Sequence, residues 1–191
     1  MIPNREQAWE WLCQYNQSDS LRKHGLTVEG VMRHFAALNG EDPDLWGVVG
    51  LLHDLDYEQY PDQHCAKVQE ILGEKGVDEA VIRAVASHGY GMCSDIEPLS
   101  RLEKTLYTID ELSGLITAAA LMRPSRSVMD IEVKSVKKKF KDKRFAAGVD
   151  REVIVKGAEG LGMELDAVIA ETIRGMQEVA EAIGLEMHTA E

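Results

Sequence analysis

The stretch DPDLWGVVGLLHDLD, residues 42–56, carries the clearest structural signal in the chain. Asp42-Pro43-Asp44 combines acidic residues with a proline, as is typical of the start of a helix. The residues that follow are apolar on most faces of this helix, which predicts a central, buried position. An unpartnered aspartate buried at the end of such a helix would be costly, whereas a metal ion would offset the cost. The pair His53-Asp54 is therefore a candidate metal site.

Helical periodicity of apolar residues continues over the rest of the chain. Residues 21–38 form a clear example, which Asn39-Gly40 ends in the usual way. No segment shows the strict alternation of a strand, so the sequence predicts an all-α fold. Further helices are predicted after Pro3 and over residues 64–75, 78–87, 101–122, 133–140, 150–161 and 164–183.

The domain organisation follows from the same pattern. We expect a helical core in residues 1–123 and a C-terminal helical cap in residues 124–191, packed together as one compact domain. Residues 125–127, directly after Pro124, are the predicted hinge between the two parts. A chain of 191 residues is long enough to bury a sizeable core in a single domain.

Composition and charge restrict the function. The net charge of −12 repels nucleic-acid backbones, so we expect no duplex nucleic acid as partner, although a bound metal could still attract a small anion. Three widely spaced cysteines indicate reduced thiols and a cytoplasmic protein. The start of the chain lacks the pattern of a signal peptide, and the longest apolar stretch, residues 45–52, is too short to span a membrane. The oligomeric state is left open.

The placement of the histidines is more informative than their number. Neighbouring helix residues point about 100° apart, so His53 and Asp54 can share one ion only where several helices converge. Imidazole and carboxylate groups on such helices form the ligand sets of several divalent metals. His34 has no partner motif and is expected to be a surface or packing residue, and His188 lies in the C-terminal tail. The histidines and aspartate that fall at helix ends or on packing helices are His24, His53, His64, His88 and Asp110.

The order of these residues resembles a known family. His24, then His53-Asp54, then Asp110 is similar to the His…His-Asp…Asp signature of the HD-domain superfamily of metal-dependent phosphohydrolases. The stretches GLLHDLD, residues 50–56, and YTIDEL, residues 107–112, resemble the family's signature segments, and the resemblance covers about residues 20 to 120. It implies an HD-domain-like helical bundle, here with a C-terminal helical extension.

The resemblance also implies a metal centre with one or two divalent ions. The first ion would be held by His24, His53, Asp54 and Asp110. His64 and His88 look like the extra ligands of dinuclear members, with Asp54 as the bridge to a second ion. The sequence leaves open whether the metal is manganese, iron, zinc, nickel, cobalt or magnesium.

A function follows from what the family does. We expect a phosphomonoesterase or phosphodiesterase that acts on a small phosphorylated metabolite such as a nucleotide, through water made acidic by the metal. Two alternatives stay open. One is a dinuclear iron oxygenase on the same ligand frame, and the other is a non-catalytic module that senses a ligand and contains a structural metal.

Four further residues are candidates for catalysis or substrate binding beside the catalytic Asp54. Glu111 adjoins Asp110 and is either a general acid or base or a solvated helix residue. Lys104, six residues before Asp110, is a candidate for contact with phosphate. Lys137 and Lys138 belong to residues 134–144, which hold seven basic residues and one acidic residue. This segment is either an anion clamp or a solvated helix face. Asp56 either orients a metal ligand or caps the following turn.

Overall fold

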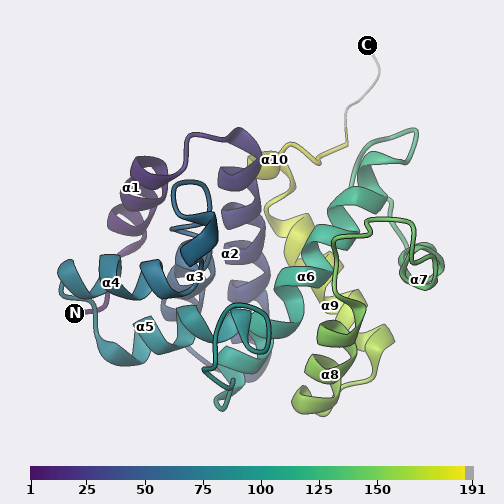
Figure 1. Cartoon of the computed structure of the whole chain (residues 1–191). Helices are drawn as coiled ribbons and strands as arrows, with labels where there is room; N and C mark the ends of the chain where they lie inside the picture. Colours follow the sequence, from purple (N-terminus) through teal and green to yellow (C-terminus); the bar gives the residue numbers. More distant parts are fainter. Residues whose placement is uncertain (188–191) are drawn as a thin grey trace.

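The computed structural model describes residues 1–187, and in this part of the chain helices joined by turns and loops are present without any strand (Figure 1). The all-α prediction is therefore confirmed. The α-helices are α1 (Arg5–Tyr15), α2 (Asp19–Asn39), α3 (Pro43–Leu52), α4 (Ala66–Glu74), α5 (Glu79–Ala86), α6 (Arg101–Leu121), α7 (Val133–Lys141), α8 (Arg151–Leu161), α9 (Leu165–Glu178) and α10 (Ala180–Ile183). Two short 3-10 helices are η1 (Pro61–Gln63) and η2 (Ser87–Gly89).

Two predicted helix boundaries were wrong. The helix predicted from residue 64 begins at Ala66, because residues 61–63 form η1 and Cys65 has a left-handed backbone with φ of 66°. The single helix predicted over residues 164–183 is divided in two. Val179, with φ of −115° and ψ of 15°, leaves the helical region between α9 and α10.

Helix α3 is the buried helix that the opening stretch predicts. The side chain of Asp42 accepts hydrogen bonds from the backbone of Asp44 and Leu45, which satisfies donors that a helix start leaves free. Every residue from Trp46 to Leu52 is buried. The capped start and the apolar faces together explain why the helix packs between its neighbours and ends inside the protein at His53.

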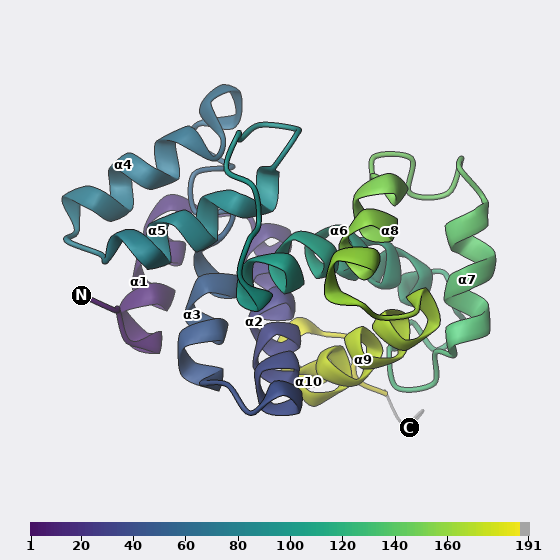
Figure 2. The ribbon, with the colours of Figure 1, turned by 90° about the horizontal axis from the view of Figure 1, so that it is seen from below.

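The long helices α2 and α6 connect the two sides of the molecule. Helix α2 packs against α3 on one side and α9 on the other, and α6 packs against both α2 and α8. Figures 1 and 2 show α1, α3, α4 and α5 on one side of this pair and α7, α8 and α9 on the other. The helices on both sides of the molecule therefore pack on the same two central helices, α2 and α6.

Hydrogen bonds also connect the C-terminal extension to the rest of the protein. The ring of His34 on α2 contacts Glu171 and Glu178 of α9 at 2.8 and 2.7 Å, which agrees with the packing role expected for this histidine. In the predicted hinge, Ser127 is buried and its hydroxyl donates to the carbonyl of Leu185. The division of the chain at residue 123 stays a prediction. His188 lies outside the described residues.

Within residues 1–187, none of the helices is both long and apolar enough to cross a membrane.

Candidate metal centre

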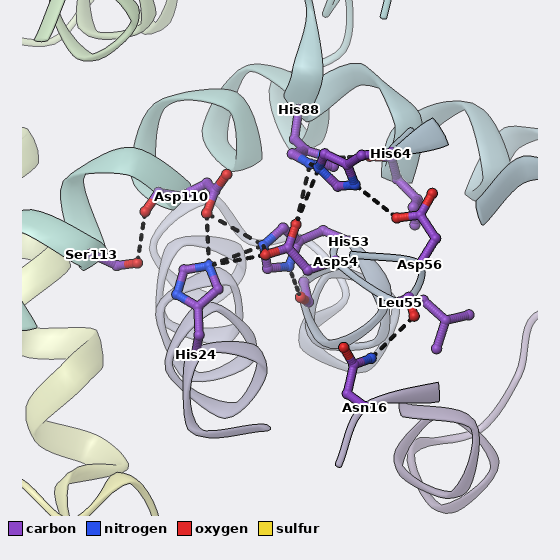
Figure 3. Close-up of polar contacts among 12 residues, drawn as sticks. Asn16, His24, His53, Asp54, Leu55, Asp56, His64, His88, Asp110 and Ser113 are labelled. Atoms are coloured by element: carbon purple, nitrogen blue, oxygen red, sulfur yellow. Dashed lines mark hydrogen bonds and ion pairs between the residues drawn. The ribbon is translucent and has the colours of Figure 1, made fainter. Parts of the chain in front are cut away.

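Five segments bring the predicted ligands to one place (Figure 3). His24 comes from α2, and His53 and Asp54 follow the last turn of α3. His64 directly follows η1, and His88 lies within η2, the short turn that continues α5. Asp110 lies in the middle of α6. Residues 86 positions apart in sequence therefore meet around one buried point.

The first group of ligand atoms consists of one atom from each of four residues. Asp110 Oδ1 lies 2.9 Å from His24 Nε2 and 3.3 Å from His53 Nε2. Asp54 Oδ2 lies 3.6 and 3.3 Å from the same two nitrogens, which are 3.2 Å apart. Ligand atoms bound at about 2.0–2.2 Å to one ion stand roughly this far from one another. The four side chains can therefore hold one metal ion.

The second group uses the other oxygen of the same aspartate. Asp54 Oδ1 lies 3.4 Å from His64 Nε2 and 3.5 Å from His88 Nε2. The two imidazole nitrogens are 3.1 Å apart. The carboxylate of Asp54 thus presents one oxygen to each group, which is the arrangement of a ligand that bridges two metal ions.

Hydrogen bonds orient three of the imidazole rings. The Nδ1 atoms of His53 and His88 lie 2.7 and 2.6 Å from the carbonyls of Gly50 and Val85. A carbonyl only accepts, so each Nδ1 carries the proton and each Nε2 keeps its lone pair for a metal. His64 Nδ1 donates in the same way to Asp56 Oδ1 at 2.7 Å. Such partners fix the tautomer and the ring orientation of metal ligands.

The charges of the candidate ligands favour a bound cation at the centre. Burial by itself lowers the pKa of His53, but Asp54 and Asp110 raise it well above its usual value. Burial would raise the pKa values of both aspartates, yet the neighbouring histidines hold them well below the usual range. These two carboxylates, whose side chains are only 16% and 15% exposed, are therefore stable as anions only beside a cation. A divalent ion supplies that charge, so the donor set fits a metal.

Asp56 contacts a candidate ligand, and its other oxygen reaches helix α4 rather than the turn that directly follows it. Its Oδ1 accepts from His64, and its Oδ2 accepts from the backbone N–H of Val68 in the first turn of α4 at 2.8 Å. The side chain is fully buried. One carboxylate therefore orients a candidate ligand and caps the next helix.

We predict that Asp56→Asn weakens the second metal position selectively. An amide has one accepting oxygen and one donating nitrogen, so it cannot accept from both His64 and Val68. Loss of such a partner costs about 10- to 100-fold in metal affinity. Calorimetric titration of metal-free protein with manganese should show the weaker second site, while the first keeps its affinity. Asp62→Asn, on exposed η1, is the control. Two unchanged affinities would show that Asp56 does not support the second position.

A cavity of about 460 Å³ opens onto the centre. Five of the six candidate ligands, all except His53, line it together with Glu111, and no lysine or arginine contributes to its wall within residues 1–187. Glu111 Oε2 accepts from the backbone of Asp150, and burial raises the pKa of Glu111 to about 7. The remaining wall residues are Leu21, Tyr57, Gly89, Met92, Cys93, Gly114 and Val149.

The three predicted lysines do not lie at this cavity. Lys104 lies six residues before Asp110 on α6. Six steps of about 100° place the two side chains about 120° apart around the helix, so they do not share a face. The Lys104 side chain lies near Gly160 of α8 instead. Lys137 pairs with Asp166 at 2.7 Å. Lys138 lines a separate cavity beside Arg123. The structure therefore brings Glu111 to the site and leaves these lysines outside it.

Beyond the candidate ligands and Glu111, the sequence analysis did not single out individual residues of the cavity wall. Gly114 was recognisable in principle, because it lies four residues after Asp110 on the same helix face. Leu21 likewise lies one turn before His24. Met92, Cys93 and Val149 lie in loops whose approach to the centre no local pattern indicates.

An all-α chain with two His/Asp ligand groups that share a carboxylate defines a candidate metalloprotein. Residues 21–115 match the family model of the HD domain, which includes all six candidate ligands. The chain belongs to the HD-domain superfamily, which consists mostly of metal-dependent phosphohydrolases. No curated protein and no solved structure gave a significant match.

Proposed function

We propose that this protein is a phosphohydrolase with two divalent metal ions that acts on a small phosphorylated metabolite. The observation that carries the proposal is the carboxylate of Asp54, which presents one oxygen to each ligand group. Two ions on a shared carboxylate are well suited to phosphate esters, because they can stabilise both the attacking and the leaving oxygen. HD-domain membership supports the same chemistry.

The residues of the candidate site would bind the metal ions and transfer protons in the following way. His24, His53 and Asp110 hold the first position, and His64 and His88 hold the second. Metal ions bound there would neutralise the phosphoryl oxygens and lower the pKa of a coordinated water. Glu111 is the carboxylate of the cavity wall that belongs to neither group. We assign it the transfer of a proton to or from the substrate, because of its position.

The wall of the cavity indicates what kind of substrate fits. Because the described residues place no lysine or arginine in the wall, the phosphate would be held at the metal positions themselves. The organic part then meets Leu21, Tyr57, Met92 and Val149, which are mostly apolar surfaces. A volume of about 460 Å³ suits a small molecule rather than a polymer. We therefore propose a compact phosphate ester, either a monoester or a diester, as substrate.

The test combines phosphate release with a variant that blocks the cavity. Manganese-loaded protein should hydrolyse some members of a panel of phosphomonoesters and phosphodiesters. Gly114→Leu places a bulky side chain in the wall, which displaces the substrate and should lower the rate about 100-fold. Gly114→Ala is the matched control, since a Cβ there meets no atom within 4 Å. Both variants should retain their metal content. Fully loaded protein that releases no phosphate from the panel would argue against the proposal.

A second candidate function is a dinuclear iron oxygenase on the same ligand frame. The absence of basic residues from the described cavity wall favours it, because an uncharged organic substrate needs no anion clamp. This function predicts iron in protein purified without chelator and substrate-dependent oxygen uptake. Elemental analysis followed by oxygen-electrode measurements separates it from the phosphohydrolase.

A cytoplasmic location stays part of the proposal, on the grounds of composition. The same holds for the absence of duplex nucleic acid and membrane partners, which rests on the net charge of −12 and the lack of a long apolar segment.

A further inference from the structure

Two cysteines meet at the edge of the metal centre. Cys65 and Cys93 are 28 residues apart in sequence, and their Sγ atoms lie 2.7 Å apart. Both are free thiols in the structure. Cys65 Sγ also lies 3.8 Å from Nε2 of His88, one of the candidate ligands of the second metal position. A disulfide bond is about 2.05 Å long, so the two sulfur atoms need only a small shift to bond.

The backbone around each cysteine holds the pair in place. Cys65 has a left-handed conformation just before α4, and its carbonyl accepts from the side chain of Gln69 at 2.8 Å. Cys93 lies in a tight turn in which the backbone N–H groups of residues 92, 93 and 94 all point to the carbonyl of Gly89. A Cβ atom built on Gly89 would collide with both sulfur atoms. The turn therefore needs glycine at this point for the two thiols to meet.

The two thiols differ in accessibility. Cys65 is fully buried. Cys93 is exposed and lines the cavity that leads to the metal centre. A small oxidant in the cavity reaches Cys93 first, and the buried Cys65 sulfur lies directly behind the Cys93 sulfur. This is the arrangement of an attacked cysteine with a resolving partner.

We propose that Cys65 and Cys93 form a reversible disulfide when a peroxide enters the cavity. The Cys93 sulfur attacks the peroxide, the O–O bond breaks, and Cys93 becomes a sulfenic acid while one oxygen leaves as water. The Cys65 sulfur then displaces the second oxygen as water, and the S–S bond forms. Two thiols lose two electrons and two protons, and one hydrogen peroxide is reduced to two molecules of water. A small dithiol reverses the reaction by exchange.

The new bond would connect the two segments that carry the ligands of the second metal position. Cys65 follows His64 directly, and Cys93 lies in the turn that begins in η2 beside His88. Oxidation therefore links the segments of His64 and His88 through sulfur and should change how the second ion binds. The first group, on α2, α3 and α6, contains neither segment.

The test measures mass rather than turnover, so it does not depend on the proposed phosphohydrolase. Metal-free Cys13→Ser protein is treated with hydrogen peroxide and alkylated under denaturing conditions. We expect a monomer that has lost about 2 Da, accepts no alkyl group, and regains two reactive thiols after dithiothreitol. A digest should contain one peptide pair linked through Cys65 and Cys93.

Two further variants and a metal probe keep the proposal falsifiable. In the Cys13→Ser background, Cys65→Ser should stop at a Cys93 sulfenic acid that dimedone traps, and Cys93→Ser should keep Cys65 reduced. Circular dichroism confirms that both variants are folded. Overoxidation of Cys93 in the Cys13→Ser protein without a linked peptide, or dimers linked between chains, would overturn the proposal. So would sulfur-to-metal charge-transfer absorption in cobalt-loaded protein together with thiols that resist peroxide, because the cysteines would then be metal ligands.

Discussion

Asp54→Asn should remove both metal ions and lower hydrolysis on the order of 1,000-fold, because this one carboxylate serves both positions. Its Oδ2 faces His24 and His53, and its Oδ1 faces His64 and His88. An asparagine removes the negative charge that both groups share, offers only a neutral oxygen to one group, and directs an NH₂ donor, which cannot bind a metal, at the other. No other candidate ligand contacts both groups in this way, so no other single substitution in the centre should cost both ions.

Elemental analysis after dialysis against manganese, together with the phosphate assay, measures this effect. Asp62→Asn again serves as control, since it makes the same chemical change on the surface of η1. Circular dichroism should show that the helical content is retained. His24→Gln provides the contrast, because it should weaken the first ion alone. An Asp54→Asn protein that still holds two ions per chain would refute the bridging role.

Gly175→Leu should destabilise the protein by about 3 kcal/mol, through the contact between α9 and α2. A Cβ at Gly175 would lie 2.8 Å from the Cα of Val31 and 3.1 Å from the Cβ of His34. The nearest obstacle is backbone, so no change of rotamer relieves it. The two helices would have to move apart, which loosens the attachment of the C-terminal extension to the HD domain.

Gly160→Leu is the matched control for that substitution. Gly160 also lies inside a helix, but a Cβ there meets only the Cδ atom of Lys104, at 4.0 Å. Leucine favours helix more than glycine does, so this variant should gain up to about 1 kcal/mol. Urea denaturation followed by circular dichroism gives both values. Equal stability of the two variants would contradict the close approach of α9 to α2.

The candidate metal ligands were proposed from their order along the chain, which resembles the HD signature, and some of them also belong to a clear local pattern. His53-Asp54 ends a helix whose capped start and apolar faces are visible in adjacent residues, and Asp110 lies in a long periodic helix. Lys104 shows where such reasoning fails. Its closeness to Asp110 in sequence suggested a role at the site, but helix geometry turns it toward α8. Lys137, in the same way, pairs with Asp166 on a different part of the surface.

The sequence by itself determined most of the helices and the buried character of α3, because caps and periodicity depend on residues within a few positions of one another. The candidate ligands followed from the resemblance of their order to the HD signature. Only the tertiary structure decided that the two oxygens of Asp54 face different ligand groups, that Cys65 meets Cys93, and that the cavity wall lacks the predicted lysines. These features depend on the direction of side chains from segments up to 86 residues apart. The packing of α2, α3 and α6 sets that direction, and no local pattern in the sequence encodes it.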